Sequence, residues 1–394
     1  MLSPVLFGLV GFAVDYSIFF SQRSRMQEVA DGAALAAVRE ASLQGWNRST
    51  AESVVSAFVD ANLNSEAGSP AVYTSSVTVD DTRRTVTVSI RQDGHGYFLL
   101  GMFKTNPQIR TTSTGALAGT TNICVLTLDE RDSDSLHLSG VSSLTANRCG
   151  VFANSASPSA IAVRDGARIT AHSICSAGGY RGNLNDFSPE PVTDCPPILD
   201  PLAERKPPPV GRCDYRDLTI SGVGWIRPGV YCGGLTIDGL AKVVALPGVY
   251  VIKDGPLEIT GNAILLGDSV GFYLTGTTAA TRIGTSTTIS LSAPKSGPMA
   301  GILFFEDRNA TEGRDFEISS KDARRLVGTI YLPKGRLRVK GASQFAGISE
   351  WTAIIANSIE VEKGPSLRLN SDYEASDVPV PSGIVGTERI YLSR

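Results

Sequence analysis

Six cysteines are the residues of this chain best suited to covalent chemistry. They are Cys124, Cys149, Cys175, Cys195, Cys213 and Cys232. None stands in a Cys-x-x-Cys pair, the close spacing that lets one turn present two ligands to zinc. An even number of widely spaced cysteines favours disulfides formed in an oxidising compartment. Inert buried thiols and a catalytic or metal-binding role are the alternatives, and the spacing leaves the disulfide pairing open.

Carboxylates and histidines could supply acid–base chemistry. The carboxylates grouped in one stretch are Asp194, Asp200, Asp214 and Asp217. Such a group could serve a polysaccharide-cleaving site, but it surrounds a Pro-rich segment, which predicts solvated loop positions. The histidines are His95, His137 and His172. None stands in a nucleophile-elbow context, so the sequence predicts surface histidines.

Cofactor and metal motifs are not found in the sequence. A strand ending at Asp129 could begin an Asp-x-Ser-x-Ser cation site, but Arg131 stands where the first serine oxygen is needed. The Gly-Gly steps lack the spacing of a phosphate loop or dinucleotide fingerprint. We therefore expect a protein that is not an enzyme, with no cofactor, no metal and no small-molecule substrate.

Composition narrows the class further. The chain has 394 residues, with 36 Lys and Arg against 39 Asp and Glu and a formal charge of −3. This balance argues against a nucleic-acid partner. Charged residues make up only 19%, which argues against a disordered chain, and the 40 glycines indicate many tight turns.

The N-terminal run from residue 2 to 20 is almost entirely apolar. As a helix rising 1.5 Å per residue it would span about 28 Å, close to the thickness of a bilayer core. The sequence predicts a membrane anchor over residues 1–45. Asp15 interrupts the run, either near the water boundary or paired with a partner helix inside the membrane.

Residues 22–41 contain no proline and continue the helical pattern beyond the apolar run. Small side chains, Ala33 and Ala37 among them, recur on one face. They would let another helix approach closely, so we expect them to dock a partner protein. An exposed, alanine-rich helix is the alternative.

Two segments carry a resemblance to a known family. The run from Gly8 to Tyr16 ends in Ala-Val-Asp-Tyr, and Arg25 to Ala37 reads RMQEVADGAALAA. Both resemble the N-terminal segment of TadG-like proteins of Flp (tight adherence) pilus assembly. Weaker similarities follow, such as Pro228-Gly-Val-Tyr and Pro247-Gly-Val-Tyr. The resemblance implies other pilus-assembly proteins as partners of the N-terminal helix.

Residues 46–120 read as a small α+β module. A second helix is expected over residues 49–64, and residues 71–79 and 84–91 alternate apolar and polar side chains, which indicates a β-hairpin. Residues 111–118 could add a further strand.

Residues 121–394 are dominated by an apolar-x-apolar-x-Gly step. It begins at Leu136, Leu218, Leu235, Leu257 and Leu337, with near variants at Ile161 and Ile359. Each step is a short strand with an inward-facing apolar pair, and only stacked repeats can bury such faces. We predict an all-β, right-handed parallel β-helix; an antiparallel sandwich is the alternative. The Pro-rich insertion near 189–211 is expected to project as loops.

The sequence thus predicts a non-enzymatic, membrane-anchored envelope protein, and the resemblance implies a role in Flp pilus biogenesis as a scaffold or in adhesion. It would cross the inner membrane once and place its C-terminal region in the periplasm. Arg23 and Arg25 follow the apolar run and oppose this orientation by the positive-inside rule. The cysteines and the resemblance favour it. The alternative function is a membrane-tethered β-helix that binds or cleaves polysaccharide.

Overall fold

The computed structural model describes residues 3–64, 72–80, 85–93, 108–119, 122–341, 344–386 and 388–393. The chain divides into two compact units. The first comprises residues 1–120 and 387–394, and the second comprises residues 121–386. Each unit has its own buried core.

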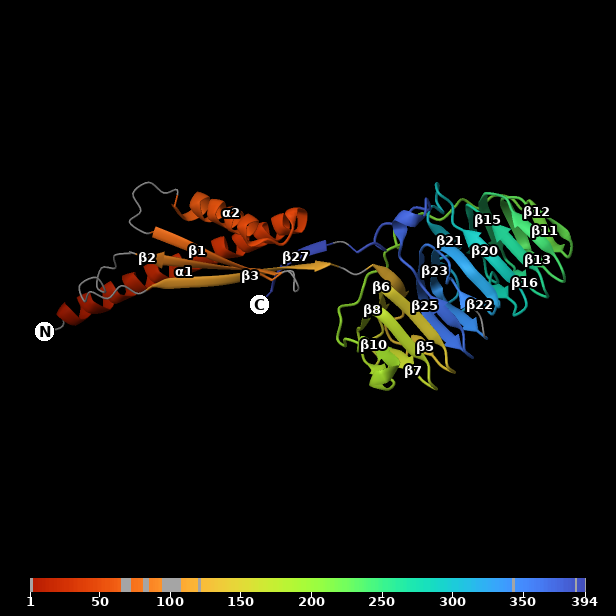
Figure 1. Ribbon diagram of the computed structural model, residues 1–394, viewed down its shortest axis with the longest axis horizontal. Helices are drawn as coiled ribbons and strands as arrows, with labels where there is room; N and C mark the ends of the chain where they lie inside the picture. The colour runs from red at the N-terminus through yellow and green to blue at the C-terminus, as the bar shows by residue number, and fades with distance from the viewer. Residues whose placement is uncertain are drawn as a thin grey trace. The chain divides into compact units, whose positions relative to one another are not determined.

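The first unit combines two helices with an antiparallel sheet. Helix α1 spans Ser3–Gln44, and α2 spans Arg48–Val59 before a π-helical turn at Asp60–Asn64. The sheet order is β1-β2-β3-β27. Its strands are Val72–Asp80, Thr85–Asp93, Ile109–Gly119 and Glu388–Ser393, respectively. Helix α1 packs on β2, β3 and β27, while α2 packs on α1 and β1 (Figure 1).

Local sequence explains these elements. Asn47 begins α2 because its side-chain oxygen accepts a hydrogen bond from the Thr50 amide at 2.8 Å, which satisfies a free helix-terminal donor. The predicted hairpin is confirmed, because β1 and β2 pair antiparallel with Val77 opposite Val88. Helix α1 continues unbroken through residues 22–41, as expected.

None of the helices that the structure describes is both long enough and apolar enough to span a bilayer.

The second unit is a parallel β-solenoid of about 11 turns. Seven strands form a first run before the Pro-rich segment: β4 Ile123–Thr127, β5 Leu136–Leu138, β6 Ser143–Ala153, β7 Ile161–Val163, β8 Arg168–Ser176, β9 Tyr180–Arg181 and β10 Phe187–Ser188.

A second run follows the Pro-rich segment. It consists of β11 Tyr215–Ile220, β12 Val223–Ile226, β13 Gly229–Ile237, β14 Lys242–Ala245, β15 Gly248–Lys253, β16 Leu257–Ile259, β17 Ile264–Gly267, β18 Val270–Thr275, β19 Thr281–Ile283, β20 Thr288–Ser292, β21 Ile302–Glu306, β22 Asp315–Ile318, β23 Asp322–Lys340, β24 Gln344–Phe345, β25 Thr352–Glu362 and β26 Ser366–Arg368.

The repeated step found in the sequence is confirmed as the coil of this solenoid. All its copies stack in register in one column, in the spatial order Leu218, Leu235, Leu257, Thr281, Phe316, Leu337, Ile359, Leu136 and Ile161. The glycines that close the steps turn the corner: Gly239 and Gly261 have φ of +64° and +67°. A Cβ on Gly261 would lie 2.7 Å from the Gly239 carbonyl oxygen, so only glycine fits.

The coils do not stack in chain order. The first run begins beside the end of the second run, because β25 pairs with β4 and β5 while β26 pairs with β6. We call this junction the seam. From the seam the first run extends in one direction. The chain then crosses to the far end and winds back to the seam through β11–β26 (Figure 1).

The crossing is made by the Pro-rich segment, which does not project as loops as predicted. It lies against the solenoid wall. The Arg205 guanidinium donates to the carbonyl of Pro298 at 3.0 Å, and Tyr331 donates to Asp200 at 2.6 Å. Arg308 donates to the carbonyls of Leu202 and Arg205. The reason is that a chain without strand partners must satisfy its carbonyls elsewhere, and Arg308 of the wall does so for Leu202 and Arg205.

The predicted disulfides are present, and the pairing is now defined: Cys124–Cys149, Cys175–Cys195 and Cys213–Cys232. Two of them bracket the crossing segment, and the third lies at the seam.

The prediction that residues 121–394 form one β-helix needs correction at its C-terminal end. Strand β27 pairs with β3 of the first unit, so the solenoid is an insertion between two neighbouring strands of that sheet.

Candidate functional site

The alanines predicted to dock a partner lie inside the first unit. Ala33 and Ala37 are fully buried by the chain itself, in a core shared with α2 and the sheet. Small residues are needed here because backbones approach closely: a Cβ on Gly115 of β3 would lie 2.7 Å from the Ala34 carbonyl oxygen. The small-residue face therefore receives the chain's own sheet and α2. The prediction that it is an exposed docking face is wrong.

Asp15 is also buried, with 1% of its surface exposed, and it has an interaction partner. Burying a carboxylate costs free energy unless it is paired, so a partnered position is the expected outcome.

A different face of α1 is exposed and apolar. Phe12, Tyr16 and Phe20 are 60%, 61% and 62% exposed, and their rings follow one another with centroids 6.4 Å apart. The i, i+4 spacing places them on one side of the helix. Val14 and Ile18 are exposed nearby. We call Phe12, Tyr16 and Phe20 the aromatic ridge. The chain itself leaves this apolar surface uncovered.

The i, i+4 aromatic spacing was visible in the sequence. The sequence analysis predicts a membrane anchor over this run from its hydropathy and length alone, which do not distinguish one face of the helix from another.

On the solenoid, one outer column of side chains alternates in charge. In register it runs Glu258, Arg282, Glu317, Arg338, Glu360 and His137. Ion pairs connect several members; Arg338 Nε lies 2.6 Å from Glu360 Oε2, and Arg282 Nη1 lies 3.4 Å from Glu258 Oε1. A one-residue slip would break this pattern, so the column helps to define the register of the coils.

His137 occupies the last position of that column, at the seam. Its Nδ1 atom lies 3.8 Å from Asp134 Oδ2, and Arg164 donates to the same Asp134 oxygen at 2.7 Å. A cavity of about 300 Å³ adjoins these residues, lined also by Arg336, Ser358 and Glu360. His137 is therefore mostly covered and not a free surface histidine. His172 is exposed, and His95 lies outside the described residues.

The four carboxylates considered for catalysis do not form one site. Asp200 accepts the hydrogen bond from Tyr331, and Asp214 accepts one from the Val230 amide at 2.8 Å in the coil at the far end. Asp217 lies in β11 of that same coil, whereas Asp194 follows the first run. Burial raises the pKa of the Tyr331 hydroxyl, and the Asp200 carboxylate raises it further.

Asp129, the residue examined as a cation ligand, is occupied by hydrogen bonds. Its Oδ1 atom accepts from the amides of Arg131 and Asp132 at 2.8 and 2.6 Å, and its Oδ2 atom accepts from Asn357. Among the residues that the structure describes, no group of three or more His, Cys, Asp or Glu could hold a metal ion.

One carboxylate is deeply buried in the solenoid wall. The side chain of Glu306 is 4% exposed, with Arg314 Nε 3.5 Å away. Its Oε2 atom accepts from the Lys334 amide at 3.0 Å. Burial raises the pKa of Glu306, although the Lys334 amide and Arg314 act in the opposite direction.

Comparison with known proteins bears on the first unit. Residues 1–40 match the family model "Putative Flp pilus-assembly TadE/G-like". This match confirms the resemblance carried by the N-terminal helix, and it covers the part of α1 that bears the aromatic ridge. A TadE/G-like segment joined to a disulfide-linked β-solenoid fits a pilus-associated envelope protein. No curated protein and no solved structure matches the chain.

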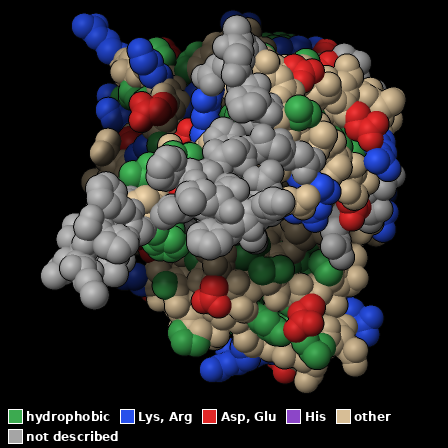
Figure 2. All heavy atoms as spheres, turned by 90° about the vertical axis from the view of Figure 1, so that its left-hand side faces the viewer, with side chains coloured by type: hydrophobic (Ala, Val, Ile, Leu, Met, Phe, Trp, Pro, Cys, Tyr) green, Lys and Arg blue, Asp and Glu red, His purple; other side chains and the backbone are tan. Residues whose placement is uncertain are grey.

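On the face shown in Figure 2, the distribution of charged side chains does not point to a nucleic-acid partner. Figure 2 shows acidic and basic side chains interspersed there, without a large patch of one sign. A nucleic-acid partner would require a basic stripe or patch.

Proposed function

We propose that this chain is a non-enzymatic component of Flp pilus assembly that acts as a scaffold at the bacterial envelope. The observation that carries the proposal is the aromatic ridge on α1, which lies within the residues that match the pilus-assembly family. Three large exposed rings on one helix face are typical of surfaces that bind a partner. The partner would be another pilus-assembly protein.

The solenoid would supply the rigid part of the scaffold. Each coil buries its inner face against two neighbours, and the disulfides and the pinned crossing segment restrict movement between coils. Such a body can present binding surface without rearrangement. We propose scaffolding and adhesion as its role.

We further propose that the chain is attached to the inner membrane through residues 2–20 and that its solenoid lies in the periplasm. The apolar sequence supports the attachment, and three disulfides support an oxidising compartment. An alkaline phosphatase fusion after Arg394 should be active. An inactive fusion, together with six alkylatable thiols in unreduced protein, would contradict this placement.

The decisive experiment removes the ridge without touching the core. Phe12→Ser, Tyr16→Ser and Phe20→Ser are combined in one full-length variant and expressed in the native host. We expect the melting temperature of the solenoid and the recovery of the chain in the membrane fraction to stay unchanged, while copurification of pilus-assembly proteins and pilus formation are lost.

Val72→Ser is the matched control, because Val72 is 62% exposed in the same unit but belongs to β1 and not to α1. Normal partner recovery and normal piliation in the triple variant would overturn the proposal. Loss of both in the control would show that the assay reports general damage to the unit.

A further inference from the structure

A second cavity lies at the seam, on a different face from His137. It has a volume of about 240 Å³ and is lined by Thr145, Asn147, Arg148, Arg368, Leu369 and Asn370. We propose that this cavity binds an oxyanion, a phosphate or carboxylate group carried by a sugar. The proposal is independent of the pilus-assembly role proposed above.

The charge of the lining is one-sided. Both ionisable residues are arginines, and the remaining polar groups are hydroxyls or amides. Arg148 Nη1 lies 4.0 Å from Asp372 Oδ2, too far for a hydrogen bond, and 73% of its side chain is exposed. Arg368 makes no ion pair with any residue that the structure describes. Arg148 therefore has only one distant carboxylate, that of Asp372, and Arg368 has no ion-pair partner among the described residues.

The alternating column shows what paired arginines look like in the same solenoid. Arg338 there lies within 4 Å of three carboxylates, on Asp315, Glu360 and Glu362. The solenoid thus supplies carboxylates to arginines where it uses them for its own stability. At the second cavity the guanidinium groups remain available to a ligand. The planar N–H donors of a guanidinium group match the oxygens of phosphate and carboxylate groups.

Two segments far apart in the chain create the cavity. Arg148 and Asn147 belong to β6 of the first run, whereas Arg368 and Asn370 belong to β26 or follow it at the end of the second run. Thr145 and Arg368 are paired in register across the seam. The site exists only when the two runs have joined.

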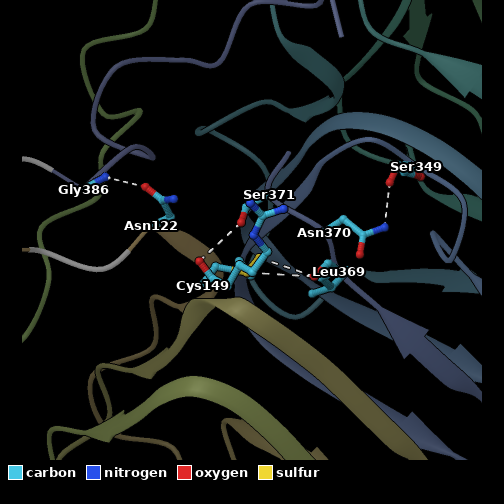
Figure 3. The surroundings of a disulfide bond; sticks show 9 residues. Asn122, Cys149, Ser349, Leu369, Asn370, Ser371 and Gly386 are labelled. Atoms are coloured by element: carbon cyan, nitrogen blue, oxygen red, sulfur yellow. Dashed lines mark hydrogen bonds between the residues drawn. A yellow bond between two sulfur atoms is a disulfide. The ribbon is translucent and has the colours of Figure 1, made fainter. Parts of the chain in front are cut away.

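The backbone around the arginines is held from several sides. Cys149, next to Arg148, is linked to Cys124, and both sulfur atoms lie 3.9 Å from the Leu369 carbonyl oxygen (Figure 3). Ser371 donates to the carbonyl of Arg148 at 3.3 Å. Asn370 donates its amide to the Ser349 carbonyl at 2.8 Å, which fixes its orientation (Figure 3). The backbone that carries the arginines is therefore preorganised, which reduces the entropy lost on binding.

The size and the flanking groups indicate the class of ligand. The volume lies below the about 300–1,000 Å³ of sites for drug-sized molecules, which leaves room for one anionic group with a single sugar ring. Thr145, Asn147 and Asn370 offer the hydroxyl and amide groups that sugar hydroxyls use. Arg168 lies on the same outer face, two coils from Arg368 and exposed, so a longer acidic chain could be followed beyond the cavity.

The test uses the full-length protein in detergent and isothermal titration calorimetry. The probes are glucuronate, glucose 1-phosphate and inorganic phosphate, with glucose as the neutral comparison. We expect saturable binding of the anionic probes, weakened by salt, and no binding of glucose. Arg148→Gln and Arg368→Gln should each weaken binding about tenfold or more, the effect of one charge-assisted hydrogen bond.

Arg216→Gln is the matched control, because Arg216 is an exposed arginine in β11 at the far end of the solenoid. Unchanged melting temperatures would show that all variants are folded, as expected for exposed side chains. Binding of phosphate alone would identify free phosphate as the source, and binding of both sugar acids would identify an acidic glycan. No saturable binding of any anion, or binding by both cavity variants as tight as that of the wild type, would overturn the proposal.

Discussion

The two units of this chain bury apolar surface in contrasting ways. The first unit brings backbones together over small side chains, with Ala30, Ala33, Ala34 and Ala37 fully buried along one face of α1. The solenoid stacks large side chains in columns. Tyr215, Tyr231, Tyr250, Phe272 and Phe304 form one such column, with consecutive ring centroids 4.6 to 6.0 Å apart.

This difference predicts which kind of substitution destabilises each unit most. A close helix–sheet contact has no room for added atoms, so the first unit should be most sensitive to an increase in side-chain size. A column of stacked residues already contains large side chains, and each residue in it packs on residues at the same position of the coils above and below. The solenoid should be most sensitive to a change in polarity at an inward position.

The largest effect is expected for Leu257→Asp in the solenoid. Leu257 is fully buried between Leu235 and Thr281 in the column of repeated steps. A carboxylate there has no partner, so we expect a loss of more than about 4 kcal/mol in the free energy of unfolding. Thermal denaturation followed by circular dichroism measures it.

Thr219→Asp is the control for Leu257→Asp, because Thr219 is exposed on the outer face of β11. It should leave the melting temperature nearly unchanged. A wild-type melting temperature for Leu257→Asp would show that Leu257 does not face the core and that the column is misassigned.

A somewhat smaller effect is expected for Ala33→Trp in the first unit. The added ring has no space between α1, α2 and the sheet, so we expect a destabilisation of about 3 kcal/mol or more of that unit alone. Hydrogen exchange resolved by unit should show loss of protection in residues 26–64 and not in the solenoid. Ser24→Trp, at an exposed position of the same helix, should be tolerated. If Ala33→Trp keeps full protection, the face is not buried and the docking prediction regains its basis.

The smallest effect is expected for Glu306→Gln, which replaces the carboxylate buried in the solenoid wall. Burial raises the folded-state pKa of Glu306 above its unfolded value. A raised pKa contributes stability below the unfolded pKa of about 4.3, and that stability is lost as pH rises through the folded pKa. The Glu306→Gln variant does not ionise. The free energy of unfolding of this variant, relative to that of the wild type, should therefore increase as the pH rises through this window.

Chemical denaturation at several pH values measures this difference. If the free energy of unfolding of Glu306→Gln instead falls relative to the wild type as the pH rises, the ion pair with Arg314 dominates and lowers the pKa of Glu306.

The local repeat made the fold predictable, but the order of the coils was not. Leu218, Leu235 and Leu257 are spaced by roughly one coil, and their stacking followed directly from the pattern. Nothing local signals that Leu136 stacks on Ile359, since that contact joins distant parts of the chain. Rungs at Thr281 and Phe316 were missed because their residue types depart from the leucine–isoleucine step.

The site was less predictable than the fold for the same physical reason. Small residues on α1 correctly indicated a close contact, yet composition does not say whether the neighbour is a partner or the same chain. The cavity with Arg148 and Arg368 combines residues from both sides of the seam. Neither arginine has a distinctive sequence context, so only the three-dimensional register could bring them together.

The position of β27 has a consequence for the order in which the protein matures. During synthesis α1, α2 and β1–β3 are made before the solenoid, but the edge of β3 has no partner until residues 388–393 follow it. An unpaired edge strand is open to incorrect pairing, so the first unit depends on a segment that is made after the whole solenoid. We expect truncation before residue 388 to leave a complete solenoid with an unfinished first sheet, so β27 couples completion of the first unit to synthesis of the solenoid.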